Sequence, residues 1–493
     1  MKKELVFALC CLSALGSVAQ ENQDRDVFKE YERFKQQSKS EYSDFRKKAN
    51  DSYSEFMRHR WDWYKDQPEI KMPQEEVDPV PIPQAPDADK PLEDGLVTIK
   101  SVIHALPVPE QPNPIAAVPE VTGTTGTFTF EVYGTRMQIR LDASQRFHLK
   151  GVTENDVADG WQLLSGQAYN NLLRDCLSLR IKHNLCDWAY LNMLQQLSES
   201  FLGKGTPEAV LMQAFLFNQS GYKARLGRSR TNRLYLLVAS NHVIYKQKYF
   251  QIKDELFYPL QYEENGLFIY TAQYPGEQTM SLVVGKEQKF DVAETEPHRL
   301  VSKGGDSLEV ALQFNSNLMN FYLNYPQSHI NNDETTKWTF FATTPISERV
   351  KNQLYPVLEK AIAGKSKRDA ANVLIRFVQT AFEYKLDNEV WGDDHPFFAE
   401  ETLFYPFSDC EDRVVLYATL VRDLLHLDTI LLYYPGHLAM AVCLEEEVGG
   451  KTLQFGGKTY VYCEPTCSGY APVGWCPPAL SALLFYCIPT TQM

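Results

Sequence analysis

A cysteine, a histidine and a glutamate follow one another near the C-terminus in an order that suits nucleophilic catalysis. Cys410 lies directly before an apolar run, Val414 to Leu425, whose pattern predicts a buried helix. Ser408 and Asp409 are residue types that cap helices. Cys410 is therefore expected at a helix N-terminus, where aligned peptide dipoles and free N–H groups favour a thiolate over a thiol. The alternative is that Cys410 is only a small buried apolar residue.

Two predicted strands carry the residues that could activate this thiol. His437 stands at the head of one strand, which runs on from Leu438 to Leu444, and Glu464 follows a later strand over residues 459–463. If these strands pair, the histidine and the glutamate lie side by side. A nucleophile, a base and an acid that orients the base form the generalised catalytic triad, so the candidate site is Cys410, His437 and Glu464.

These motifs resemble the transglutaminase-like core, a papain-related fold. The resemblance is carried by Cys410-Glu411-Asp412 at the start of an apolar helix, by Gly436-His437, and by Glu464-Pro465-Thr466 at the end of a strand. It covers about residues 367–466 and implies Cys410 as nucleophile and His437 as general base and acid. Glu464 occupies the position where the family usually has Asp, and Ala439 stands where the family often carries an aromatic residue.

The resemblance implies acyl transfer at an amide or peptide bond of a protein or peptide substrate. The Cys410 thiolate would attack the amide carbon, N–H groups at the helix start would stabilise the oxyanion, and His437 would protonate the leaving amine. Hydrolysis of the thioester would make a cysteine peptidase or amidase, and attack by an amine would make a protein-glutamine acyltransferase; hydrolysis is favoured. The alternative is a catalytically inactive scaffold that binds peptide or glycan. No cofactor and no metal are expected, because neither a calcium-loop nor a nucleotide-binding motif is present.

The N-terminal sequence pattern predicts a secretory signal peptide over residues 1–19. Lys2 and Lys3 supply the positive region, Leu5 to Leu15 the apolar region, and Ser17-Val18-Ala19 the small residues at the cleavage site. The apolar run is too short to span a bilayer. We therefore expect a periplasmic or secreted protein with no membrane insertion after signal removal. The net charge of −14 argues against nucleic acid as a partner.

The remaining chain divides by pattern into five regions, which together predict an α+β protein with a papain-like core at its C-terminus. Tyr42, Phe45, Ala49, Tyr53 and Phe56 recur at helical spacing in the first region, and twelve prolines mark the second. The regions are a charged amphipathic helix (20–67), a Pro-rich linker that lies along the next domain (68–120), a mixed α/β region (121–262), a small antiparallel β unit (263–345) and the transglutaminase-like domain (346–493).

The α/β region is itself a possible degenerate copy of the core. A predicted helix over residues 207–219 is followed by a strand that starts near Gly221, as the later helix is followed by one after His426. Aligning Gly221 with His426 places Gly205 opposite Cys410, so this copy would lack the nucleophile. The alternative is an ordinary helix followed by an ordinary strand.

Eight cysteines remain after the predicted signal peptide. An oxidising compartment permits disulfides between them, and plain buried thiols are the alternative. A zinc site formed by four of them is a third possibility, although their spacing lacks a paired CxxC pattern. These four are Cys463, Cys467, Cys476 and Cys487.

Overall fold

The computed structural model describes most of the chain from residue 43 onward. The described ranges are 43–72, 81–87, 90–103, 120–123, 126–305, 308–330, 333–446, 448–481, 483 and 485–490. The predicted signal peptide lies outside them, as do residues 20–42. The described chain is 36% helical and 24% strand, so the prediction of a mixed α and β protein is confirmed.

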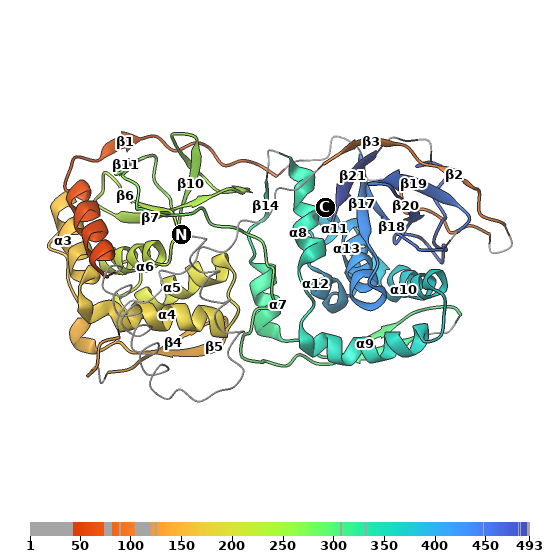
Figure 1. Ribbon diagram of the computed structural model, residues 1–493, viewed down its shortest axis with the longest axis horizontal. Coiled ribbons are helices and arrows are strands. Elements are labelled where there is room, and N and C mark those ends of the chain that lie inside the picture. The colour runs from red at the N-terminus through yellow and green to blue at the C-terminus, as the bar shows by residue number, and fades with distance from the viewer. Residues whose placement is uncertain are drawn as a thin grey trace, which may run out of the picture.

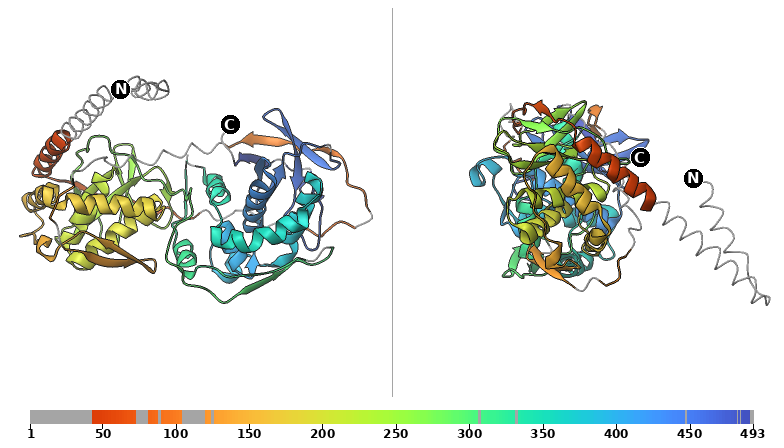
Figure 2. Two further views of the ribbon diagram at one scale, coloured as in Figure 1. Left: turned by 60° about the horizontal axis from the view of Figure 1, so that its bottom comes forward. Right: turned by 90° about the vertical axis from the view of Figure 1, so that its left-hand side faces the viewer.

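Two units, each a sheet packed against helices, lie side by side along the long axis of the molecule (Figures 1 and 2). In the N-terminal unit a buried helix, α6, lies against the central strands and against a second helix, α5. The helices of this unit are α3 (Glu154–Ser165), α4 (Asn170–Lys182), α5 (Asp187–Leu202) and α6 (Pro207–Gln219). Its sheet has the strand order β1 (Asp62–Tyr64), β11 (Leu267–Ile269), β6 (Ala224–Arg228), β7 (Leu234–Ser240), β10 (Glu255–Pro259) and β9 (Phe250–Ile252). A separate hairpin, β4 (Phe128–Val132) and β5 (Thr135–Ile139), lies beside α5 and α4.

In the C-terminal unit the central helix α13 packs on strand β18. The helices are α8 (Lys337–Thr343), α9 (Glu348–Ile362), α10 (Lys367–Ala381), α11 (Asp387–Val390), α12 (Ala399–Phe404) and α13 (Cys410–Leu420). The sheet has the order β2 (Gly95–Leu96), β19 (Lys451–Phe455), β20 (Lys458–Cys463), β18 (His437–Val442), β17 (Thr429–Tyr434), β21 (Phe485–Pro489) and β3 (Ile99–Val102).

The central five strands of the two sheets have one topology. Taken in chain order after the buried helix, the strands of the N-terminal unit are β6, β7, β9, β10 and β11, and those of the C-terminal unit are β17 to β21. In both sheets the fourth strand lies between the second and the third, and the fifth pairs with the first; all these pairs are antiparallel. This is the arrangement expected of two copies of one unit.

The helix starts correct the alignment that placed Gly205 opposite Cys410. Pro207 is the first residue of α6, as Cys410 is the first of α13. The error is two residues because the C-terminal helix continues through a π-helical turn, Val421–Leu425, before His426 ends it in the left-handed conformation. An alignment that matches the C-terminal ends of the two helices therefore misaligns their first residues by two positions.

The stretch predicted as an antiparallel β unit, residues 263–345, does not form one. Its first strand, β11, belongs to the N-terminal sheet, and β12 (His298–Val301) and β13 (Glu309–Leu312) form an isolated hairpin. Two segments within this predicted β unit are helical: α7 (Ser316–Leu323) and α8. The Asn315 side chain caps α7, and Leu318, Phe321 and Tyr322 are buried at helical spacing, so capping and packing outweigh the strand propensity of the aromatic residues.

The Pro-rich linker reaches the far unit rather than only the next domain. β2 pairs in parallel with β19 and β3 with β21, so residues 95–102 extend both edges of the C-terminal sheet. Just before them, Ala85 donates to the Ser468 carbonyl and Ser468 donates to the Pro83 carbonyl. Because β1 pairs with β11, this one N-terminal segment contributes strands to both sheets.

The helix of residues 43–57 docks on the N-terminal unit by a face that matches the predicted one only in part. Ala49 and Tyr53 are buried as expected, but Phe45 and Phe56 are about half exposed, at 53% and 52%. The docked face is partly polar, since Arg46 donates to Gln219 and Asn170, and Trp161 donates to Asn50. No helix among the described residues is long and apolar enough to cross a membrane.

The acidic segment between α10 and α13, residues 385–407, contains the two short helices α11 and α12 and two buried glutamates. Glu400 accepts hydrogen bonds from the Ser347 N–H and hydroxyl, and Glu401 Oε2 accepts from the Phe398 N–H at 3.0 Å, while Glu401 Oε1 has no partner. Burial raises the pKa of Glu400 to about 7 and that of Glu401 to about 8.

These carboxyls should make the protein less stable as the pH rises. The folded state keeps the Glu401 proton well above the ordinary Glu pKa of about 4.3, so its contribution is complete below that pH and is lost as the pH rises toward 8. The Gln side chain of a Glu401→Gln variant is neutral at every pH. The unfolding free energy of this variant, measured by urea denaturation, should therefore fall less between about pH 5 and about pH 8 than that of the parent. Each unit of pKa difference corresponds to about 1.4 kcal/mol.

Glu389→Gln is the matched control. Glu389 holds the same position at the start of α11, accepting from the Leu386 N–H, but is exposed. It should leave the pH dependence of the parent unchanged. Equal slopes for the Glu401 variant and the parent would refute a buried protonated Glu401.

Candidate active site

Cys410 lies at the start of α13, as the sequence predicted. Asp409 is the residue before the helix, and the half-buried Cys410 is its first residue. The thiol donates a hydrogen bond to Glu411 Oε2 at 2.9 Å, and the backbone of Leu438, the second residue of β18, also bonds to the sulfur. The sulfur is thereby held at the beginning of the strand that starts with His437.

His437 and Glu464 are in direct contact. His437 Nε2 lies 3.0 Å from Glu464 Oε2, and both side chains are almost wholly buried. The same carboxylate oxygen accepts from the Tyr462 hydroxyl at 3.0 Å, and Glu464 Oε1 accepts from the Thr466 N–H at 3.1 Å. Three donors thus fix the carboxylate, which in turn fixes the imidazole ring.

The ends of strands β18 and β20 hold Cys410 on two sides. β18 and β20 are antiparallel neighbours, with Met440 opposite Cys463, so His437 and Glu464 emerge at one end of the sheet. The Thr466 hydroxyl donates to the Cys410 carbonyl at 3.5 Å, and Leu438 bonds to its sulfur. The residues adjacent to the histidine and the glutamate therefore anchor the cysteine, which brings the three predicted residues into one place.

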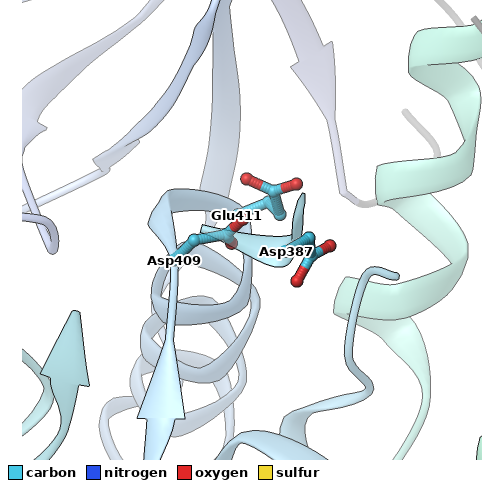
Figure 3. Close-up of side chains that lie close together, drawn as sticks. All are labelled: Asp387, Asp409 and Glu411. Carbon is cyan, nitrogen blue, oxygen red and sulfur yellow. The ribbon is translucent and has the colours of Figure 1, made fainter. Parts of the chain in front are cut away.

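The cluster of three carboxylates drawn in Figure 3 adjoins the thiol through Glu411, which accepts the Cys410 hydrogen bond. Oxygens of Asp387, Asp409 and Glu411 lie within 4.8 Å of one another, with Asp387 from the start of α11 and the other two flanking Cys410. Burial and the Glu411 carboxylate raise the pKa of Asp387 to about 8 and raise that of Asp409. Asp412, which accepts from the Phe397 and Asp409 N–H groups, has a raised pKa for the same first cause, burial, followed by the charge of Asp387.

This cluster reverses one expectation. The helix N-terminus predicted a lowered thiol pKa, but burial, together with the carboxylates of Glu411 and Asp409, raises the pKa of Cys410. The local charge is negative, because several carboxyl groups surround the start of α13, so the helix dipole is outweighed.

Several residues that contribute to the site were not predicted from the sequence. Tyr462 was seen only as a strand residue, and Gln379, in α10, supports the site by donating to the carbonyls of Glu464 and Ala471. Asp387 carries no local signal because it lies in a different element from Cys410. Asp409 and Glu411 were visible beside the cysteine, but only as helix-start residues.

The eight cysteines that the structure describes form neither disulfides nor a zinc site. Every cysteine in the described part of the chain is a free thiol, Cys463, Cys467, Cys476 and Cys487 among them. The three carboxylates are the one group of potential metal ligands within the described residues, so the zinc alternative is not supported.

Comparison of this chain with protein-family models, with curated proteins and with solved structures finds no match. The site is therefore interpreted from its own geometry.

The Glu464 carboxylate should be important for stability as well as for orientation. Glu464→Gln leaves one acceptor oxygen where two now serve three donors, so at least one buried donor loses its partner. This should lower the unfolding free energy by about 1–3 kcal/mol, measured by urea denaturation.

Glu383→Gln is the comparison, because its exposed carboxylate pairs with the half-exposed Lys385, and this substitution should change the unfolding free energy by less than about 0.5 kcal/mol. An unchanged denaturation midpoint for Glu464→Gln would show that the buried triad contact does not contribute to the fold.

Proposed function

We propose that this chain is an exported cysteine enzyme that cleaves or transfers an amide or peptide bond of a protein or peptide substrate. The observation that carries the proposal is the buried contact between His437 Nε2 and Glu464 Oε2, at 3.0 Å, next to a half-buried cysteine at a helix N-terminus. A buried histidine paired with a buried acid has few structural uses, since apolar residues would fill the same space at less cost.

The contacts assign a role to each residue. Because Nε2 bonds to Glu464, the nitrogen that exchanges a proton with the thiol is Nδ1. Cys410 attacks the amide carbon as its proton passes to His437, and the imidazolium, stabilised by Glu464, then protonates the leaving amine. Backbone N–H groups at the start of α13, that of Cys410 included, are the donors available to the oxyanion. Water then attacks the thioester and regenerates the thiol.

The architecture supports a transglutaminase-like, papain-related core. A buried helix that begins with the nucleophile, followed by antiparallel strands that carry the base and the acid in that order, is the arrangement which the sequence resemblance implies. Hydrolysis is favoured over transfer for an exported protein of this kind, and protein-glutamine acyltransferase activity is the other form of the same chemistry.

The second candidate function is a catalytically inactive scaffold that binds peptide or glycan. Two observations favour it: the raised pKa of Cys410, and the N-terminal unit, which has the same topology without the chemistry. Helix and strand starts put Pro207 and Leu234 at the positions of Cys410 and His437. Leu237 is the fourth residue of β7 and pairs with Pro259, just as Met440 is the fourth residue of β18 and pairs with Cys463. Leu260, the residue after Pro259, therefore stands at the position of Glu464, the residue after Cys463.

The test is amide hydrolysis by the purified chain. A peptide library read by mass spectrometry detects cleavage and deamidation, and a dansylated amine detects transfer. Turnover should fall by at least about 10³-fold in Cys410→Ala and in His437→Ala, because removing one member of a catalytic triad disables the unit.

Cys467→Ala is the matched control: this buried thiol is three residues from Glu464 and has no assigned role, so its loss should leave turnover nearly unchanged. Activity that survives Cys410→Ala would refute the nucleophile. A peptide or glycan bound equally well by the parent and by folded Cys410→Ala, without turnover, would establish the scaffold.

A further inference from the structure

We propose that Asp387, Asp409 and Glu411 form a binding site for one hard divalent cation, with calcium as the best-fitting ion. The site joins the start of α11 to the first turn of α13 beside Cys410 (Figure 3). It does not require the chain to be an enzyme, because its geometry is independent of the proton transfer assigned to His437.

The donor set selects the kind of ion. Three carboxylate oxygens that lie within 4.8 Å of one another can all approach a cation placed between them. Calcium takes oxygen ligands at about 2.3–2.6 Å with flexible geometry, and its remaining positions can be filled by water or backbone carbonyls. The three clustered ligands are all carboxylate oxygens, a set that favours a hard ion over softer ions such as zinc or copper.

A buried oxygen in the cluster has no partner. Asp409 is only 5% exposed, and its Oδ1 makes no hydrogen bond, although the side chain points toward the other two carboxylates (Figure 3). Leaving a buried carboxylate oxygen unsatisfied is costly. A cation between the three groups would satisfy it directly.

The surrounding charges leave the cluster unbalanced. The basic side chains that act on these carboxylates are engaged elsewhere: Lys337 pairs with Asp394 at 2.7 Å, and Arg413 donates to Ser408 and to backbone carbonyls. None of the three ligands forms an ion pair with a basic residue of the described chain. A divalent ion neutralises three converging carboxylates better than a single ammonium group does.

The experiment uses terbium as a luminescent substitute for calcium. The Trp391 indole stacks on the ring of His395, whose backbone N–H donates to Asp387 Oδ2, so the indole lies near the site and can sensitise bound terbium. We expect saturable luminescence at one ion per chain, displaced by calcium, and a higher melting temperature in calcium than in EDTA. Trp391→Phe should lower the luminescence but keep the calcium-dependent shift.

Variants identify the ligands. Losing an outer-shell partner already weakens metal binding by about 10–100-fold, so Asp387→Asn and Glu411→Gln should each weaken binding by at least about tenfold. The matched control is Asp393→Asn, since this exposed acid in the same loop pairs with Lys246 and lies outside the cluster. It should bind terbium like the parent.

Three results would overturn the proposal: no saturable terbium or calcium binding, binding that survives both ligand variants, or stabilisation by methylammonium but not by calcium. The last would identify the cluster as a site for a primary ammonium. Circular dichroism of each variant separates a lost ligand from a lost fold, and the assay of amide hydrolysis is scored separately.

Discussion

A histidine and a glutamate buried together at the end of a sheet impose the strongest constraint on the C-terminal unit. Neither group is stable there unless donors and acceptors match, and the Tyr462 hydroxyl and the Thr466 N–H complete the set. Strands β18 and β20 must therefore pair in one register. The start of α13 is then tied to the same strand ends through Leu438 and Thr466, which fixes Cys410.

The two units share one topology, but only the C-terminal unit carries the candidate triad of Cys410, His437 and Glu464. Pro207, Leu234 and Leu260 stand at the positions of the cysteine, the histidine and the glutamate in the N-terminal unit, and β1 extends its sheet by pairing with β11. The same N-terminal segment then adds β2 and β3 to the edges of the other sheet. Strand addition at sheet edges satisfies exposed backbone groups and joins the units without a further domain.

Sequence patterns predicted what depends on local periodicity. The bounds of α6 and the start of α13 followed from caps and apolar runs, and pairing of the strands after His437 and before Glu464 followed from their order. The sequence misplaced α7, because Phe321 and Tyr322 suit a strand until packing decides. The sequence did not show where residues 95–102 lie, because no local signal indicates which sheet edge a strand joins. It also did not indicate that Asp387 lies close to Cys410, because the two residues belong to separate elements.

The most direct test of the central claim compares two cysteines within one molecule. Neither Cys410 nor Cys443 is fully buried, so limiting iodoacetamide, with each thiol quantified by peptide mass spectrometry, compares the reactivity of the two thiols within one molecule. The account predicts that Cys410 is alkylated faster and that His437→Gln removes the difference while Cys443 is unaffected. A Cys410 that reacts no faster than Cys443, with or without His437, would contradict a cysteine–histidine catalytic pair.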